Sequence, residues 1–539
     1  MIRIHQIKLK PDHTQKELEL KLLRLLRINE SELLSYHVRK QSLDARKKPD
    51  IFYSYTVDAR IRDEAALPKR IQADKNFSFV TEAPYQFPAS GTAGLKNRPV
   101  IVGSGPAGLF CAYMLAANGY RPLLIERGAP VEERQRDVEE FWKTGCLNTE
   151  SNVQFGEGGA GTFSDGKLNT LVKDSYGRSR KVMELFVAHG APDDILYTNK
   201  PHVGTELLTR VVKNMREAIT AMGGEVRFHS KLTGIAAEGG RLKTLIVNDR
   251  EEIPAEAVVL ALGHSARDTF EMLLNSGLHM EGKSFAVGVR IEHEQEMVNL
   301  AQYGRTSYSL PPASYKLTAK LENGRGVYTF CMCPGGYVVN ASSEEGALAV
   351  NGMSYHNRAG KNANSAVVVT VNPADFGTGH PLAGMAFQRQ LEQKAFQIGK
   401  GKIPVQLFAD FCADKLSSGL GEITPNIKGD YTFANLREIF PETISLSLTE
   451  GIKKFNDRLH GFSSESAVLS GVESRTSSPV RIPRGETLVS SIDGIYPCGE
   501  GAGYAGGITS AAIDGLKTAE AIAQKYRKFD ENRDILRKN

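Results

Sequence analysis

The alternation of apolar and polar positions at the start of the chain predicts a small α+β module. Apolar residues occupy nearly every second position of the segment MIRIHQIKLK, which is typical of a half-buried strand. The leucines that follow have helical spacing, and Thr14 with Glu17 three positions later favours a helix that begins with a capping box. Two further alternating stretches complete the order β-α-β-β. The predicted elements are a strand at 1–10, a helix at 14–27 and strands at 35–39 and 51–57.

A polar stretch with prolines and glycines over residues 83–97 is typical of a linker, and a different pattern follows it. Short apolar runs now alternate with amphipathic helical stretches, which is typical of a parallel sheet with helices on its faces. The runs predict strands at 100–102, 121–125, 225–229 and 257–263, and the amphipathic stretches predict helices at 109–118 and 207–222.

From residue 284 the pattern becomes rich in strands, and near residue 494 it returns to the earlier type. Strands are predicted at 285–291, 327–333, 337–340 and 366–371, and helices at 385–398 and 508–525. We therefore predict an α/β fold in which a Rossmann-like domain is split around a mixed-sheet substrate or cap domain. The predicted boundaries are 1–90 for the N-terminal module, 91–283 and 485–539 for the two parts of the split domain, and 284–484 for the cap domain.

Composition and charge narrow the class of protein without identifying it. The 539 residues are 41% hydrophobic and 24% charged, which is ordinary for a globular protein. The chain has no run of about 18 apolar residues, and its first residues do not resemble a secretory signal. The six cysteines are sparse and lack zinc spacing, which favours a reducing compartment and no metal site. We expect a cytoplasmic protein without a membrane partner, and the net charge of +5 permits anionic ligands without indicating nucleic acid.

The stretch VIVGSGPAGL, at residues 100–109, carries the most informative motif. Gly103, Gly105 and Gly108 have the spacing GxGxxG between a predicted strand and a predicted helix, and the next strand ends at Glu126. This is the complete dinucleotide fingerprint, because the glycines allow a tight turn close to a pyrophosphate and the helix N-terminus attracts it. Glu126 would accept hydrogen bonds from a ribose, which disfavours NADP. The predicted contacts are Gly103, Ser104, Gly105, Pro106, Ala107, Gly108, Glu126 and Arg127.

Further segments decide between FAD and NAD. Residues 126–128, Glu-Arg-Gly, are typical of flavoproteins related to glutathione reductase, and residues 492–500 resemble their second motif, with Glu500 in the place of its acid. The strand that closes at Gly263 resembles a third motif. In that class a helix that starts near Ile508 points its N-terminus at the flavin, where the helix dipole stabilises negative charge. We therefore expect non-covalent FAD, with contacts also from Gly263, Gly499, Glu500, Gly507 and Ile508.

Five longer motifs lie along the chain: VIVGSGPAGLF at 100–110, FGEGGAGTFSDGKL at 155–168, CPGG at 333–336, GMSY at 352–355 and SRTSSPVRI at 474–482. On these motifs the chain resembles the bacterial family of FAD-dependent, or NAD(FAD)-utilising, dehydrogenases. The resemblance covers most of the length, including a module before the fingerprint. The resemblance implies the fold and the FAD cofactor, but it does not imply a reaction. From the motifs together we predict an FAD-dependent oxidoreductase that acts on an unidentified small substrate in the crevice between its domains.

The glycine-rich loop at 156–168 is a candidate part of the site. Its glycines can bring the backbone close to a flavin or a pyrophosphate, and we expect Gly159 and Ala160 to contact the cofactor. A lysine beside a flavin stabilises negative charge or binds an anionic substrate, so Lys167 is a candidate catalytic residue. The alternative is a structural turn with solvated polar side chains. The polar residues at the end of the loop are Ser164, Asp165 and Lys167.

Two arginines in VESRTSSPVRIPR, residues 472–484, are further catalytic candidates. Arg475 and Arg481 lie among small hydroxyl residues just before the chain returns to the FAD domain. Their guanidinium groups would suit an anionic group of a substrate. An ion-paired domain interface explains the same residues equally well.

Cysteines and histidines give weaker signals. Cys331 and Cys333 lie two positions apart on a predicted strand, where a disulfide would strain the backbone. Buried or pocket-lining thiols are therefore favoured, and redox activity stays open. We choose none of the histidines as a catalyst, because they are unclustered along the sequence: His202, His264, His293 and His356.

The region 284–484 contains no second GxGxxG motif, so the electron donor stays open. NAD(P)H could act as a transient donor, or electrons could come from a protein partner. A rival function is a flavoprotein that acts on RNA and docks it through the basic segment at 39–48. Asp44 interrupts that segment, and a solvated strand edge explains it as well, so nucleic acid is the less favoured partner. No amphipathic segment supports a membrane-associated quinone reductase.

Overall fold

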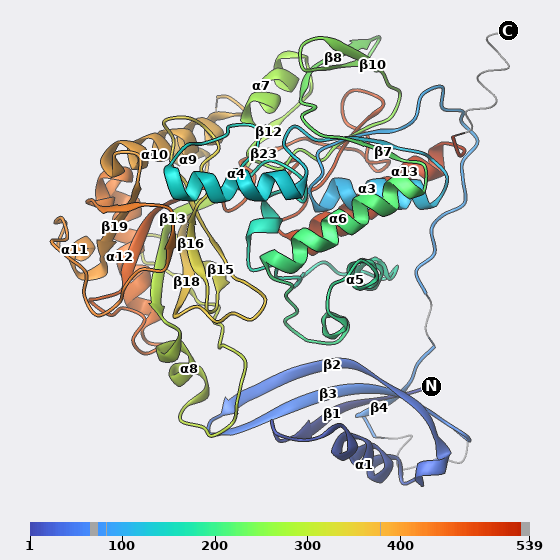
Figure 1. The fold of residues 1–539 in the computed structure, drawn as a ribbon, viewed down its shortest axis with the longest axis vertical. Helices are drawn as coiled ribbons and strands as arrows, with labels where there is room; N and C mark the ends of the chain where they lie inside the picture. The colour runs from blue at the N-terminus through green and yellow to red at the C-terminus, as the bar shows by residue number, and fades with distance from the viewer. Residues whose placement is uncertain (65–73, 82–83, 378, 530–539) are drawn as a thin grey trace.

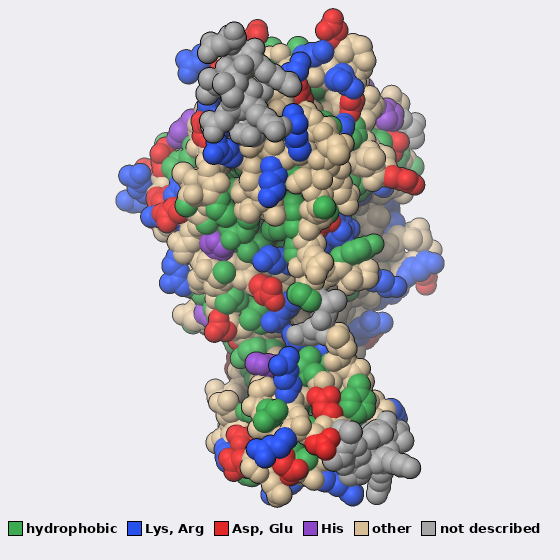
Figure 2. All heavy atoms as spheres, turned by 90° about the vertical axis from the view of Figure 1, so that its right-hand side faces the viewer, with side chains coloured by type: hydrophobic (Ala, Val, Ile, Leu, Met, Phe, Trp, Pro, Cys, Tyr) green, Lys and Arg blue, Asp and Glu red, His purple; other side chains and the backbone are tan. Residues whose placement is uncertain are grey.

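The computed structural model describes residues 1–64, 74–81, 84–377 and 379–529, and Figure 1 shows three regions in it. The N-terminal module lies at the bottom of the view, the cap domain on the left and the dinucleotide-binding domain on the upper right. In Figure 2 the N-terminal module forms a lobe below the main body. Within the described residues no helix is long and apolar enough to cross a membrane.

The N-terminal module is a small sheet with one helix packed on it. Its elements are β1 (Ile2–Leu9), α1 (Gln15–Leu26), η1 (Glu30–Glu32), β2 (Leu33–Lys47), β3 (Asp50–Ile61) and β4 (Phe77–Phe79). The order β-α-β-β is confirmed, and Thr14 and Glu17 form the predicted capping box. The strands β2 and β3 are longer than predicted, because they continue to pair with each other through polar residues beyond the module's apolar core. The sheet has the order β2-β3-β1-β4.

The first part of the dinucleotide-binding domain has these elements: β5 (Val100–Val102), α3 (Pro106–Ala117), β6 (Leu123–Ile125), α4 (Val131–Thr144), η2 (Ala160–Phe163), α5 (Arg178–Ala188), η3 (Asp193–Leu196), α6 (Thr205–Ala221), β7 (Glu225–Arg227), β8 (Leu232–Glu238), β9 (Arg241–Val247), β10 (Glu251–Pro254), β11 (Val258–Leu260), α7 (Arg267–Asn275) and β12 (Glu281–Gly282). The C-terminal part adds β24 (Ile495–Pro497) and α13 (Ile508–Lys525). Both predicted helices and the four predicted strands of this region are present. The strand β5 has its predicted bounds, and the other three are shorter than the apolar runs indicated.

A five-stranded parallel sheet in the order β24-β11-β5-β6-β7 forms the centre of this domain. Its edge strand β24 comes from the end of the chain, so the predicted split of the Rossmann-like domain is confirmed. The helices α3 and α13 pack so closely that a Cβ at Gly515 would lie 2.2 Å from the carbonyl oxygen of Ala107. A Cβ at Gly161 would lie 3.0 Å from Ile508 Cγ1 and 3.9 Å from Pro106 Cγ, so the two helices also begin close together at the carboxyl edge of the sheet.

The cap domain has these elements: β13 (Phe285–Glu294), α8 (Gln295–Tyr303), β14 (Thr318–Lys320), β15 (Gly326–Cys333), β16 (Tyr337–Asn340), β17 (Val350–Met353), β18 (Asn362–Val371), α9 (Pro373–Phe376), α10 (Ala383–Gly399), β19 (Ile403–Leu407), α11 (Phe408–Cys412), β20 (Ile427–Lys428), β21 (Tyr431–Phe433), η4 (Leu436–Ile439), α12 (Glu442–Phe455), β22 (Val468–Glu473) and β23 (Val480–Arg481). The predicted mixed sheet is confirmed: seven strands have the order β14-β15-β18-β13-β22-β19-β21, and β19 and β21 run parallel.

The two faces of the seven-stranded sheet differ in polarity. Val287, Val289 and Ile291 of β13 point into an apolar core that includes residues of α10 and α12. The opposite face carries charged side chains, among them the buried Arg290, and is covered by the small sheet β17-β16-β20. A Cβ at Gly352 of β17 would lie 2.2 Å from Arg290 Nη1, so glycine is needed where β17 crosses this arginine.

The N-terminal module contacts both of the other domains through β2 and the turn after it. Gln41 of β2 exchanges backbone hydrogen bonds with the dinucleotide-binding domain, at 2.7 Å to Tyr197 O and 2.8 Å from Asn199 N. Lys48 Nζ donates to the carbonyl oxygen of Ala301 in α8, at 2.5 Å. The module therefore spans the place where the other two domains meet.

Candidate functional site

The glycine loop predicted to bind a nucleotide is the turn from β5 to α3. Gly103 has a φ of +102°, and a Cβ at Gly108 would lie 1.8 Å from the carbonyl oxygen of Gly103. Gly103 therefore requires glycine because of its positive φ, and Gly108 requires it because a side chain would collide with the loop. Gly105 is the N-cap of α3 and Pro106 follows it at the first helical position, without a side-chain cap. The backbone N–H groups of the first turn thus point to the carboxyl edge of the sheet.

Glu126 follows β6 and its carboxylate is buried against this loop. Oε2 accepts hydrogen bonds from Ser104 N and Ser104 Oγ, both at 2.8 Å. Oε1 accepts from Gly128 N at 2.9 Å and from Gly156 N at 3.1 Å. Glu126 therefore holds the first glycine loop to the second one, which the sequence did not reveal. Its contact with a ribose stays a prediction.

The second glycine-rich loop lies directly on the first. Gly158 N donates to the carbonyl oxygen of Ser104 at 2.9 Å, and a Cβ at Gly159 would lie 3.0 Å from Gly105 Cα. The predicted cofactor residues Gly159 and Ala160 therefore flank the start of α3. Thr509 Oγ1, in the first turn of α13, donates to Leu168 O at 2.8 Å and joins the end of this loop to the other helix start.

Arg134, a buried residue of α4, organises the second loop. Its guanidinium donates to the backbone carbonyls of Asn152, Val153, Gly156, Glu157 and Gly159. Burial lowers the pKa of Arg134 to about 10, and the nearby carboxylates of Glu126 and Glu157 oppose this shift. Sequence reasoning missed Arg134. The only signal was its place on the apolar stripe of an amphipathic helix.

The remaining predicted FAD contacts lie along the carboxyl edge of the sheet. Gly507 is the N-cap of α13, again without a side-chain cap, so a second set of helix N–H groups points to this edge. A Cβ at Gly263, Gly506 or Gly507 would have no described protein atom within 4 Å. The described backbone here thus has room for a flat cofactor to lie on it, and the residues present fit FAD.

Glu500 pairs with a histidine that we did not choose from the sequence. His264 Nδ1 lies 3.1 Å from Glu500 Oε1. The turn before Glu500 is held by Asp514 of α13, whose Oδ2 accepts from Gly499 N at 2.8 Å. Arg484 donates to the same carboxylate. The predicted residues Gly499 and Glu500 therefore belong to one hydrogen-bonded edge. Gly263 lies beside it, because a Cβ at Gly501 would be 2.4 Å from the carbonyl oxygen of Gly263.

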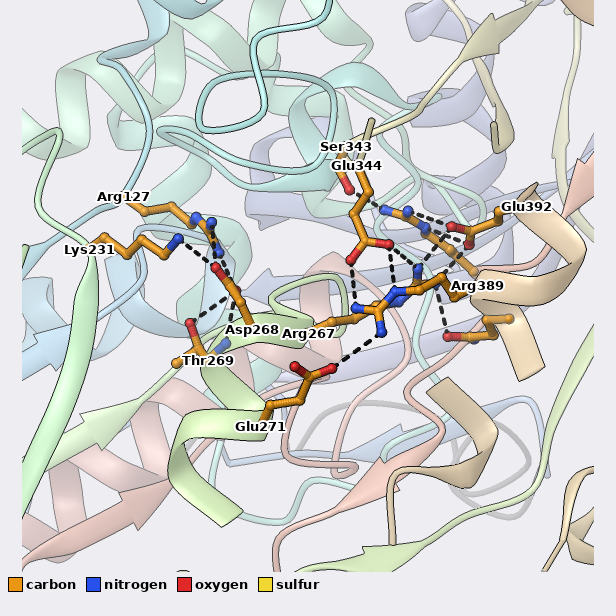
Figure 3. A network of polar contacts seen from close by, with 12 residues as sticks. Arg127, Lys231, Arg267, Asp268, Thr269, Glu271, Ser343, Glu344, Arg389 and Glu392 are labelled. Atoms are coloured by element: carbon orange, nitrogen blue, oxygen red, sulfur yellow. Dashed lines mark hydrogen bonds and ion pairs between the residues drawn. The ribbon is translucent and has the colours of Figure 1, made fainter. Parts of the chain in front are cut away.

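Arg127 has a different environment from the other predicted contacts. Its guanidinium pairs with Glu150 at 2.8 Å and with Asp268 of α7 at 2.8 Å, and it stacks over Phe155. These contacts tie the end of β6 to α7, as Figure 3 shows for Asp268. A direct contact of Arg127 with FAD stays a prediction.

The catalytic candidate Lys167 lies in a group of charged residues. Lys167 Nζ is 3.8 Å from Asp165 Oδ2, and Arg358 donates to both oxygens of Asp165, at 3.0 and 2.5 Å. The rings of His202 and His356 stack beside them, 5.2 Å apart. These histidines, unclustered in the sequence, are therefore clustered in the fold. Ser164 instead caps its own loop by donating to Gly161 O.

Arg475 is held in a domain contact. Its Nη2 lies 2.9 Å from Glu392 Oε2, and its Nη1 donates to Ser343 Oγ at 2.6 Å. Arg267 binds the other oxygen of the same carboxylate, at 2.7 Å, and extends the network to Glu344 (Figure 3). Because its donors are used inside the protein, the structure favours the ion-paired interface over substrate binding for Arg475.

Arg481, the other arginine of this motif, is more exposed than Arg475. It is exposed in β23 and its guanidinium lies 4.7 Å from the centre of the Tyr504 ring. β23 pairs with β12, away from the seven-stranded sheet. Arg481 therefore packs on the surface beside the site. A catalytic role of Arg481 stays a prediction.

The two cysteines of β15 lie at a bulge. Cys331 has a φ of +43°, and Cys333 Sγ lies 3.3 Å from Cys331 O, so both are free thiols in this structure. Cys331 is exposed and Cys333 is buried, and burial raises the pKa of the Cys333 thiol, which favours its unreactive neutral form. Arg290 donates to Cys331 O and to Glu473, at 3.0 and 2.8 Å. The structure fits pocket-lining thiols, and their redox activity stays untested.

The basic segment proposed to dock RNA is held by contacts within the protein. Arg39 donates to Asp58 at 2.5 Å, and Arg46 donates to Asp44 at 2.8 Å. Lys48 is held by Ala301, as described above. A strand with paired charges therefore explains the segment, and these contacts give no support to the RNA alternative.

Comparison with known proteins gives the family. Residues 284–476 match a model described as FAD-dependent protein, C-terminal domain-like, and residues 101–131 match an NAD(P)-binding Rossmann-like domain. Residues 1–60 match a domain of unknown function. An uncharacterized protein of Clostridium beijerinckii is 50% identical over 531 residues, which cover 97% of this chain and 99% of that protein.

Solved structures show weaker likeness. CtdE in complex with FAD is 12% identical, with a TM-score of 0.31 over 79% of this chain and 84% of that one. The glycerol-3-phosphate dehydrogenase of Bacillus halodurans complexed with FAD is 12% identical, with a TM-score of 0.35 over 80% of this chain and 65% of that one. The chain belongs to the same family as the Clostridium beijerinckii protein, and its matches to the FAD-dependent C-terminal domain and the Rossmann-like domain make it an FAD-dependent oxidoreductase.

Proposed function

We propose that the protein transfers a hydride or an electron pair between bound FAD and a small organic substrate, held where the dinucleotide-binding domain meets the cap domain. One observation carries the proposal: the N-termini of α3 and α13 lie side by side at the carboxyl edge of one parallel sheet. Neither has a side-chain cap, so their backbone N–H groups can bind anionic oxygens. Crevices at this edge are where α/β sheets bind ligands.

Different residues of this edge would bind different parts of FAD. The first turn of α3 would receive the pyrophosphate, and Glu126 would keep Ser104 and the second loop in register beside it. Gly263, Gly499 and Glu500 would support the middle of the cofactor. The N-terminus of α13 would favour negative charge next to it through the helix dipole. When bound, FAD supplies the two-electron redox chemistry.

The cap domain would supply the substrate side of the site. Arg267 of α7 and Glu392 of α10 join the two domains through a buried ion pair, which fixes their relative position. On the cap side the bulge at Cys331 rests on the buried pair of Arg290 and Glu473. A rigid connection of this kind would hold a substrate in one orientation toward the cofactor.

The electron donor is a separate part of the proposal. NAD(P)H would bind transiently, because the fingerprint at Gly103–Gly108 is assigned to FAD and the cap region carries no second one. A protein electron partner is the alternative. The two differ in a simple way, since only a nicotinamide donor reduces the flavin in the absence of other proteins.

The first test is the visible absorption spectrum of the purified full-length protein. We expect flavin bands, and we expect NADH or NADPH added without oxygen to bleach them. Bands that persist with both nucleotides would instead assign reduction to a substrate or to a protein partner. Absence of flavin bands after reconstitution with FAD would contradict the proposed function.

A further inference from the structure

Three cations that are far apart in the sequence form one group, which we call the basic cluster: Lys167, Lys200 and Arg358. Residues 166–168 pair with residues 201–203 as a short antiparallel ladder, with Lys167 opposite His202. Because side chains alternate along extended backbone, Lys200 and His202 share the face on which Lys167 lies. His202 Nε2 contacts His356 O at 2.9 Å, and this contact brings in Arg358 two residues later.

The basic cluster carries more positive charge than its neighbours neutralise. Among the described residues, the ion pairs give it a single carboxylate, Asp165, which Arg358 and Lys167 share. Lys200 Nζ donates to a neutral group, Ser314 Oγ, at 3.3 Å. Lys200 is exposed at the surface but partly desolvated by its neighbours, which lowers its pKa, and repulsion from Lys167 and Arg358 lowers it further. An anion bound between these side chains would relieve that repulsion.

The basic cluster lies beside the proposed flavin site. The residue after Lys167, Leu168, accepts a hydrogen bond from Thr509 in the first turn of α13. On the other side, Gly360 N, two residues after Arg358, donates to the carbonyl oxygen of Gly335, just after β15, at 3.0 Å. The basic cluster therefore extends from the helix start that would face the flavin to the cap domain.

The N-terminal module braces the same place. Gln41 forms its two backbone hydrogen bonds with Tyr197 and Asn199, immediately before Lys200. Lys48 is anchored on Ala301 of α8, and Tyr303 of that helix donates to Pro311 O at 3.0 Å, three residues before Ser314, the partner of Lys200. The module thus contacts the segments next to the basic cluster from two sides.

We propose that Lys167, Lys200 and Arg358 bind the anionic group of the substrate, a carboxylate or a phosphate, and that the N-terminal module positions Lys200 for this contact. The inference rests on the proposed function, because it takes the molecule bound beside the flavin to be the substrate. Lys167 stays a candidate for a position near the reacting groups, as its glycine-rich motif suggested. Lys200 and Arg358 become binding residues that neither the sequence nor the family description assigns.

The test measures anion binding directly, by calorimetry on the FAD-loaded full-length protein. The probes are succinate and inorganic phosphate, each added at constant ionic strength maintained with chloride. We expect saturable binding of at least one probe. Lys200→Gln and Lys167→Gln should each weaken it about ten- to hundredfold, as expected for losing one charged hydrogen bond. Lys200→Arg, which keeps the charge, should retain most of the binding.

A matched control separates loss of the proposed site from a general effect of removing a lysine. Lys454→Gln removes an exposed lysine of α12 that pairs with Glu450, and it should leave anion binding unchanged. Binding of succinate alone assigns a carboxylate, and binding of phosphate alone assigns a phosphate group. No saturable binding, or equal binding by the Lys200→Gln and control variants, overturns the inference. A chain that binds anions at this cluster but takes up no FAD contradicts only the proposed function.

Discussion

Arg134 has no exposed surface, and its guanidinium donates hydrogen bonds to backbone carbonyl oxygens rather than to a carboxylate. Its guanidinium gathers the carbonyls of the second glycine loop around one centre. A planar group with five N–H donors is suited to this task, and lysine is not. The loop that lies against the start of α3 therefore owes its shape to one side chain of α4.

Arg134→Met should destabilise the protein and weaken FAD binding. The substitution keeps a long apolar stem but leaves several buried carbonyls without a donor, and we expect a loss of about 3 kcal/mol in the free energy of unfolding. Chemical denaturation and the FAD content of the purified protein measure the two effects. Arg136→Met, on the exposed face of the same helix, should change neither by more than about 0.5 kcal/mol. Equal behaviour of both variants would contradict the role given to Arg134.

At the scale of elements, the starts of α3 and α13 define the proposed cofactor edge. Each begins at a glycine that serves as N-cap without a side-chain hydrogen bond, which leaves the first N–H groups to another partner. The two positions differ in one useful respect. Gly105 lies against the second glycine loop, whereas a Cβ at Gly507 would meet no described protein atom within 4 Å.

Gly507→Leu should therefore reduce FAD binding without unfolding the protein. Gly507 has a φ of 173°, which is extended backbone that any residue adopts, so the change costs little strain. The new side chain would occupy the space above the start of α13, and we expect FAD affinity to fall at least about tenfold, as for steric loss of one good contact. Fluorescence titration of the apoprotein with FAD measures this. Gly419→Leu, at an equally open position of the cap domain, is the control. Unchanged affinity in Gly507→Leu would place the flavin elsewhere.

Sequence periodicity predicted the elements whose buried residues recur at regular intervals along the chain. The helix α13 has its predicted bounds, and β5 is an uninterrupted buried strand. The bulge at Cys331 could not be predicted, because its positive φ depends on the partner strand and on Arg290 below it. The same holds for the basic cluster, because a short ladder joins Lys167, near the end of the second glycine loop, to Lys200, in a segment that has no motif.

At the scale of the whole molecule, the dinucleotide-binding domain and the cap domain are joined by buried charge. Glu392 of α10 receives Arg267 from one domain and Arg475 from its own, and Glu344 with Arg389 extends the network toward the surface (Figure 3). The motif that contains Arg475 was visible in the sequence. Its role could not be decided there, because Arg475 follows β22 and the acid that it binds lies 83 residues away on α10.

Glu392→Gln should be strongly destabilising, because it leaves Arg267 and Arg475 buried without their shared counter-charge. We expect a loss of about 3–5 kcal/mol at neutral pH. Burial alone would raise the pKa of Glu392, but the two arginines hold it well below its ordinary value. This contribution is therefore present above the ordinary pKa of a glutamate and is lost as the pH falls, so the difference between the variant and the natural protein should shrink in acid. Denaturation at neutral and acidic pH measures this difference. Glu450→Gln, which removes only an exposed pair with Lys454, should show none of it. A variant at Glu392 as stable as the natural protein would mean that the two domains are held together by packing alone.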